Sequence, residues 1–124
     1  MSCDFAIVSL PKPLTDAEAM KLYAALCESD VSGVTGNPAI DAFYAELTAT
    51  HPEIDDVPED KVDDFDLCPW SIAFDRSPGH LIICCVWKKA GYVQRLLTDL
   101  TRRHGLALID PQQQTISYPG KRSW

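Results

Sequence analysis

The apolar run over residues 81–87 constrains the fold more than any other feature of the chain. It is far too short to cross a bilayer. Its side chains are apolar at successive positions, so a strand built from it presents apolar groups to both faces of a sheet. Such a strand has to lie in the interior of a sheet, with both of its faces covered.

Four further segments carry strand signals. Residues 5–10 form a second run without regular polar alternation and are predicted as the other interior strand. Residues 70–74 alternate between apolar and polar side chains, which is typical of an edge strand, and the Pro-Gly pair at 78–79 predicts a tight turn into the 81–87 run. Residues 106–109 predict a fourth strand, and residues 115–118 predict a short return strand.

Three amphipathic segments predict helices. Thr15 and Glu18 have the spacing of a capping box, and they begin a helix that extends to about residue 29. An Asn-Pro pair at 37–38 begins the second helix. Apolar residues at helical spacing over 93–100 predict the third helix, and Gly105 is its expected left-handed cap.

The predicted order is β-α-α-β-β-α-β, in which two strand-helix-strand crossovers flank one hairpin. This order is typical of an α+β domain of the ferredoxin-like, split βαβ class, here with a four-stranded sheet and the helices on one face. We expect residues 1–119 to form this single domain and residues 120–124 to form a flexible tail. If all helices cover one face, the other face of the 81–87 strand still requires a cover.

The composition is that of a globular domain. Hydrophobic residues make up 46% and charged residues 23% of the 124 residues, which argues against a disordered or membrane-spanning chain. The N-terminus has neither the basic region nor the long apolar stretch of a signal peptide. Five cysteines without paired spacing indicate free thiols, so we expect a cytoplasmic protein.

Acidic charge is concentrated in residues 53–66, which we call the acidic segment. It holds eight of the eighteen acidic groups and one basic group, Lys61, and so carries the whole formal net charge of −7. The remainder, with ten acidic and ten basic groups, is neutral. Nucleic acids and anionic membranes require basic surfaces, so neither is an expected partner. A basic protein or a cation fits better.

Motifs for catalysis or cofactor binding are weak. Cys68 or Cys84 could meet His51, His80 or His104 in a Cys/His hydrolase. The simpler interpretation is that the cysteines fill the core and the histidines mark the ends of elements. The chain also lacks zinc-ligand spacing, the alternating ligands of a calcium loop and a phosphate-binding glycine motif. We therefore expect no metal and no cofactor.

Two groups of charged residues remain. Asp75, Arg76 and His80 bring an acid, a cation and an imidazole together at the predicted hairpin turn, which makes them a candidate polar site, although such turns are often merely solvated. Basic residues recur every seven positions in the third predicted helix, at Lys88, Arg95 and Arg102. This spacing indicates an outward, solvated helix face.

Four short motifs lie in the C-terminal third: Ser77-Pro-Gly-His80, Val86-Trp87, His104-Gly-Leu106 and Asp110-Pro-Gln112. With them, residues 70–112 resemble a set of small bacterial proteins of uncharacterised function. Some relatives of that set look like immunity proteins of toxin systems. The motifs are mostly turn and helix-end signals, and the resemblance implies no catalytic residue.

These features favour a non-catalytic binding protein, an immunity-type inhibitor whose acidic segment docks on the basic substrate-binding surface of a toxin such as a nuclease. Clustered carboxylates can imitate phosphates and accelerate association with a basic cleft. The expected contacts are the acids and aromatics in and beside the segment: Asp55, Asp56, Glu59, Asp60, Asp63, Asp64, Phe65, Asp66 and Trp70, with Tyr44 nearby. The alternatives are a homodimer that uses an open sheet face for self-association or for a small ligand, and a small enzyme of unknown reaction.

Overall fold

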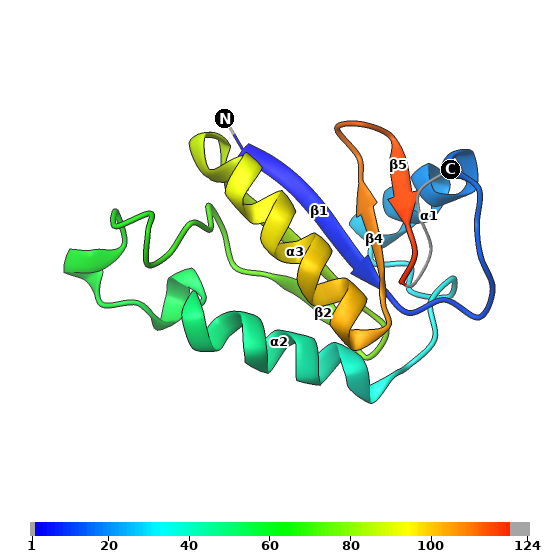
Figure 1. The fold of residues 1–124 in the computed structure, drawn as a ribbon, viewed down its shortest axis with the longest axis horizontal. Coiled ribbons are helices and arrows are strands. Elements are labelled where there is room, and N and C mark those ends of the chain that lie inside the picture. The colour runs from blue at the N-terminus through cyan, green and yellow to red at the C-terminus, as the bar shows by residue number, and fades with distance from the viewer. Residues whose placement is uncertain (1, 120–124) are drawn as a thin grey trace.

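In the computed structural model, which describes residues 2–119, the chain forms an α+β fold of three helices and a five-stranded antiparallel sheet (Figure 1). The strands are β1 (Ser2–Val8), β2 (Asp75–Ser77), β3 (His80–Val86), β4 (Ala107–Asp110) and β5 (Thr115–Ser117). The helices are α1 (Asp16–Cys27), α2 (Pro38–Thr50) and α3 (Ala90–His104), with short 3-10 turns η1 (Ile54–Asp56), η2 (Glu59–Lys61) and η3 (Trp87–Lys89).

The sheet has the order β2-β3-β1-β4-β5. The two predicted interior strands are confirmed, because β3 lies between β2 and β1, and β1 lies between β3 and β4. The predicted count of four strands is wrong, since the return strand β5 pairs with β4 and extends the sheet. The predicted tail, residues 120–124, lies outside the described residues.

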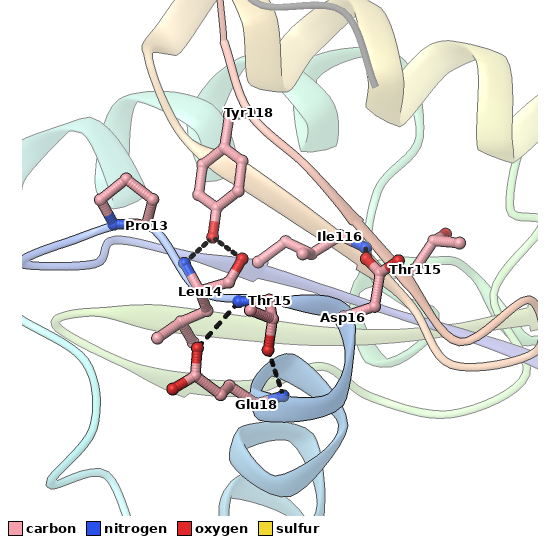
Figure 2. A pocket seen from close by; sticks show the side chains of 8 residues that line it. All are labelled: Pro13, Leu14, Thr15, Asp16, Glu18, Thr115, Ile116 and Tyr118. Atoms are coloured by element: carbon pink, nitrogen blue, oxygen red, sulfur yellow. Dashed lines mark hydrogen bonds between the residues drawn. The ribbon is translucent and has the colours of Figure 1, made fainter. Parts of the chain in front are cut away.

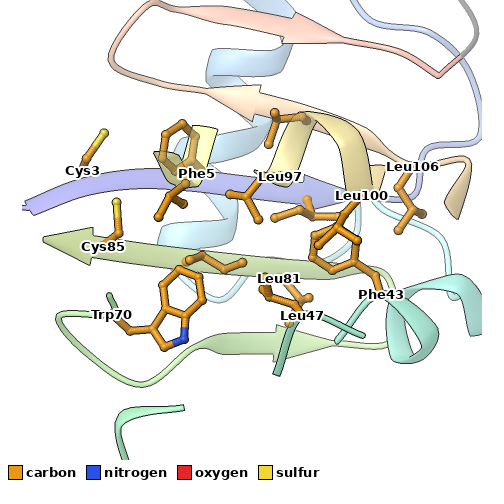
Figure 3. Close-up of a cluster of buried hydrophobic side chains, with 14 of the residues drawn as sticks. Cys3, Phe5, Phe43, Leu47, Trp70, Leu81, Cys85, Leu97, Leu100 and Leu106 are labelled. Atoms are coloured by element: carbon orange, nitrogen blue, oxygen red, sulfur yellow. The ribbon is translucent and has the colours of Figure 1, made fainter. Parts of the chain in front are cut away.

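The sheet is covered on both faces, so the prediction of helices on one face is wrong. Helices α2 and α3 pack on the face that carries Phe5, Ile7, Leu81 and Ile83 (Figure 3). Helix α1 packs on the other face, where Ala19, Leu22 and Leu26 meet Ala6, Val8, Ile82 and Ile109. Strands that are apolar at successive positions require a cover on each side, and α1 supplies the second one.

The segment 70–74 is not the edge strand that its alternation predicts. Trp70 makes one isolated bridge to Cys85, and its indole N–H donates to the His51 carbonyl at 2.9 Å. The backbone N–H of Phe74 donates to Glu53 Oε1 at 2.9 Å, so it is unavailable to a neighbouring strand. Regular pairing with β3 begins only at Asp75, and the predicted tight turn connects Ser77 to His80.

The predicted helix ends are confirmed. The Thr15 hydroxyl accepts from the Glu18 N–H, and the Glu18 carboxylate accepts from the Thr15 N–H, which completes the capping box. The Asn37 side chain caps α2. Gly105 follows α3 with φ of 69°, a left-handed conformation that favours glycine.

The Asp110-Pro-Gln112 motif ties the β4-β5 turn to β1. The Gln112 side chain accepts from the Asp4 N–H at 2.8 Å and donates to the Asp4 carbonyl at 2.7 Å. The same amide donates to Asp110 Oδ1 at 2.8 Å. The glutamine thereby satisfies backbone groups of β1 beyond the end of its ladder with β4. The motif has a structural function.

Candidate functional site

The acidic segment connects α2 to the buried Trp70 region and projects beyond the end of the sheet, at the left of Figure 1. It contains the two turns η1 and η2 and no longer helix or strand. Val57, between these turns, is 9% exposed and belongs to the main core cluster. The segment is therefore attached at its middle as well as at its ends.

His51 holds the base of the segment. Its Nδ1 lies 2.9 Å from the carbonyl oxygen of Leu67, and its Nε2 lies 2.7 Å from the hydroxyl of Tyr92 in α3. The ring is buried and packs edge-on against Trp70 and Tyr92. One histidine thus joins the two ends of the segment and connects both to α3.

Three acidic side chains of the segment are engaged internally. Glu53 accepts from the Tyr44 hydroxyl and from the Phe74 N–H, and the bond to Glu53 raises the pKa of the Tyr44 phenol. Asp64 accepts from the backbone N–H groups of Asp66 and Leu67. The hydrogen bond and charge of a lysine in η3, Lys89, lower the pKa of Asp66.

The other five carboxylates are exposed and have no hydrogen bond or ion pair with any residue in 2–119: Asp55, Asp56, Glu59, Asp60 and Asp63. Like charges near one another repel, and Lys61 is the one basic residue of the segment. These five groups form an anionic surface without internal partners in the described part of the chain. An external cation would meet them without displacing an internal partner.

The aromatic residues expected as anchors have different environments. Trp70 is 1% exposed and lies in the core, so it cannot contact a partner of the folded protein. The expectation that Trp70 is a partner contact is therefore wrong. Phe65 and Tyr44 are half-buried, and each carries a cation of the same chain: Lys88 Nζ lies 4.9 Å from the Phe65 ring centroid, and the Arg76 guanidinium lies 3.7 Å from that of Tyr44.

Two exposed aromatics were not singled out from the sequence. Trp87 is 55% exposed and Tyr92 is 41% exposed. Tyr92 lies at the base of the acidic segment, where its hydroxyl contacts His51. Trp87 precedes Lys88 and Lys89, which contact Phe65 and Asp66. The apolar run that predicts the interior strand includes Trp87, but β3 ends at Val86. The two basic residues that follow Trp87 were the available signal of a strand end.

The candidate polar site at the hairpin turn is divided between two faces of the sheet. Asp75 Oδ2 lies 3.5 Å from Nε2 of His80, and both residues point to the α1 face. Arg76 points to the opposite face, where it contacts Asp41 at 3.4 Å and the Tyr44 ring. Successive strand residues alternate between faces, so the three groups do not converge.

Ser77 completes a serine-histidine-aspartate set, with its Oγ 2.5 Å from His80 Nδ1. The Ser77 hydroxyl also accepts from the Gly79 N–H at 3.2 Å, which is a turn contact. His80 is 1% exposed, and its Nε2 has no hydrogen bond. A substrate could reach neither ring nitrogen without opening the hairpin, so the arrangement is best explained as a cap of the turn.

Four of the five cysteines are poor nucleophiles. All five are free, and burial raises the pKa of Cys84 and of Cys85 to about 12. Burial also raises the pKa of Cys3 and of Cys68. These groups are thiols at neutral pH, and the thiolate is the reactive form. The three histidines form no hydrogen bond with a cysteine anywhere in residues 2–119.

A shallow pocket of about 560 Å³ lies between the N-terminus of α1 and β5 (Figure 2). Its polar groups bind one another: the Tyr118 hydroxyl contacts the Leu14 backbone, and Asp16 accepts from the Ile116 N–H at 3.0 Å. Asp16 thereby caps an outward N–H of the edge strand β5. The pocket retains little to orient a ligand.

Within residues 2–119, no group of three or more histidine, cysteine or acidic side chains could hold a metal ion. No helix of that part is long and apolar enough to cross a membrane. Comparison of the chain with known protein families, with curated proteins and with solved structures finds no match. The function is therefore argued from the residues of this chain.

Proposed function

We propose that this protein is a non-catalytic binding protein whose acidic segment docks on a basic surface of another protein, as an immunity-type inhibitor docks on its toxin. The proposal is supported by five exposed carboxylates that have no partner within residues 2–119, on a segment fixed at three points. Clustered anionic charge accelerates association with a basic cleft.

Fixing the segment before binding lowers the cost of association. A flexible acidic loop would lose conformational entropy when it docks, and that loss would reduce affinity. His51 closes the base of the segment, and Val57 anchors its middle in the core. The carboxylates are thus displayed in a limited set of positions. Such an arrangement favours a partner whose cationic groups match these positions over other cationic molecules.

The chain's own lysines illustrate the chemistry that a partner would use. Lys89 binds Asp66, and Lys88 lies over the Phe65 ring. A partner that presents lysine or arginine side chains can occupy the five free carboxylates in the same way. Trp87 of η3 and Tyr92 of α3 supply exposed aromatic surface of the kind that dominates many interfaces.

We also propose that the domain is an elaborated ferredoxin-like fold. The order of β2, β3, β1 and β4 supports this assignment, while α1 on the second face and β5 depart from the simple plan. Self-association through an open sheet face is less favoured, because α1 lies on that face. Buried, protonated cysteines support a cytoplasmic location and give no support to an enzyme.

Affinity capture from the cell that makes the protein tests the proposal. Three baits are compared: the wild type, a segment variant with Asn at Asp55, Asp56, Asp60 and Asp63, and a control variant of equal net charge. The control carries Gln at Glu28 and Asn at Asp41, Asp75 and Asp99, which lie outside the segment.

A partner with a basic surface should be retained by the wild type and by the control, released by salt, and lost by the segment variant. A partner that all three baits retain equally would contradict docking through the acidic segment. A partner lost by both variants would indicate a dependence on net charge alone and would also contradict it.

A further inference from the structure

A second groove lies between α3 and the β4-β5 hairpin, on the side of α3 that faces away from α2. Its volume is about 270 Å³. Polar side chains from both elements line it beside Leu108: Gln94, Thr98, Arg102, Gln113, Thr115 and Ser117, with Asp110. Interfaces between a helix and a sheet are ordinarily apolar and closely packed, and this groove differs because it is polar and unfilled.

Arg102 is the cation of the groove, and it has no hydrogen bond or ion pair with any residue in 2–119. Of the other cations in η3 and α3, Arg103 and Lys89 are paired with acids, whereas Arg95 has no such partner in residues 2–119. Arg103 contacts Glu46 at 2.6 Å and Asp99 at 3.2 Å, and Lys89 contacts Asp66. Arg102 is exposed, so its guanidinium is solvated in the free protein and available to a ligand.

Asp110 is the acid of the groove, and its carboxylate is already saturated. It is 7% exposed and accepts from the backbone N–H groups of Gln112 and Gln113 and from both of their side-chain amides. It therefore stabilises the turn and leaves Arg102 free. The hydroxyls of Thr115 and Ser117 complete a donor-rich wall opposite the helix.

We infer that this groove is a binding site for the oxyanion of a small ligand, a carboxylate or a phosphate group, held by Arg102 with the hydroxyls of Thr115 and Ser117. A guanidinium presents a planar fork of donors that matches both groups. The volume lies just below the usual range for ligand pockets, so the groove suits only a small molecule. This site is separate from the acidic segment, and neither proposal depends on the other.

The test is a titration of the isotope-labelled protein with inorganic phosphate and, separately, with acetate, at constant pH and ionic strength. Backbone amide NMR signals of Gln113, Thr115 and Ser117 report on the groove. Saturable shifts of these signals with either anion support the site. Saturation by phosphate alone indicates a phosphorylated ligand, and saturation by acetate alone indicates a carboxylate. No saturable shift with either anion overturns the inference.

Substitutions separate binding at Arg102 from general attraction of anions. Arg102→Gln should raise the dissociation constant about tenfold or more, because it removes charge-assisted hydrogen bonds. Arg95→Gln, on the same helix but outside the groove, is the matched control and should leave the constant unchanged. Arg102→Lys keeps the charge without the planar fork and should fall between them. Equal affinity in the wild type and in both Arg102 variants would overturn the site.

Discussion

The Nδ1 atom of His51 lies 2.9 Å from the carbonyl oxygen of Leu67, and this contact closes the acidic segment into a loop. A carbonyl only accepts, so Nδ1 carries the hydrogen, and in the neutral ring Nε2 accepts from the Tyr92 hydroxyl at 2.7 Å. The contacts thus select one tautomer. A buried side chain far from the tip of the segment determines how the tip is presented.

Replacing His51 should therefore cost more stability than its size suggests. His51→Ala leaves the Leu67 carbonyl without its donor and creates a cavity beside Trp70, so we expect a loss of about 2–4 kcal/mol in the free energy of unfolding. Tyr92→Phe keeps the ring and removes one hydrogen bond, at a cost of about 1 kcal/mol. Urea denaturation of the three proteins measures both values. Equal stability of His51→Ala and the wild type would show that the segment is not held here.

Two glycines near the hairpin turn should respond differently to alanine. A Cβ at Gly79 would lie 2.6 Å from the Thr35 carbonyl oxygen and 2.9 Å from Val34 Cγ2, too close for backbone that cannot easily move. A Cβ at Gly36 would lie 3.6 Å from Pro78, an ordinary contact. Gly79→Ala should destabilise by about 1–3 kcal/mol, whereas Gly36→Ala should be close to neutral. Thermal unfolding of the pair measures this, and the reverse ranking would contradict the packing of the turn.

Thiol labelling should distinguish the cysteines. Cys27 is exposed, whereas Cys3, Cys68 and Cys85 are buried and Cys84 is half-buried. Under native conditions a thiol reagent should modify Cys27 rapidly and the others only when the protein unfolds. Mass spectrometry of the labelled protein identifies the modified positions. Rapid native modification of Cys85 would show that the interior of the sheet is open to solvent.

Stability should decline at alkaline pH. The pKa of Cys84 and of Cys85 is about 12 in the folded protein, against an ordinary value of 9.0. Above pH 9 the unfolded chain releases these protons first, so the free energy of unfolding falls as the pH rises from 9 toward 12. Below pH 9 the contribution is complete and constant. Urea denaturation across this interval should show a shallower decline for Cys85→Ala than for the wild type; equal slopes would contradict the account.

The sequence predicts the interior of the fold better than its edges. The strands β1 and β3 were predictable because strands with apolar side chains on both faces fit only in the interior of a sheet. The helix ends were predictable because capping contacts join residues that are close in sequence. The segment 70–74 was misinterpreted because its alternation reflects Trp70 and Phe74 packing inward, while Glu53 occupies the Phe74 N–H. The face covered by α1 was unpredictable because periodicity identifies a buried stripe and not its partner.

The candidate site was predictable in position and not in detail. Charge counting located the acidic segment, but only coordinates separate the carboxylates bound within the chain, such as Asp66, from the free ones, such as Asp60. An aromatic residue beside an acidic run can serve a partner or the core. Trp70 serves the core, because its indole is buried there.

In the proposed function, steering resides in the five free carboxylates rather than in the net charge of the molecule. Stopped-flow measurements can test this by comparing association of the captured partner with the wild type, with the segment variant and with the control variant of equal net charge. The segment variant should associate about tenfold or more slowly than the wild type at low ionic strength, and the control should associate nearly as fast.

Salt supplies the decisive comparison in that measurement. At about 1 M ionic strength the screening length falls to about 3 Å, so the association rate of the wild type should converge on that of the segment variant. The circular dichroism spectra of all three proteins should coincide, since exposed charges add little stability. If the segment variant associates at the wild-type rate with the same dependence on salt, the acidic segment is not the docking surface.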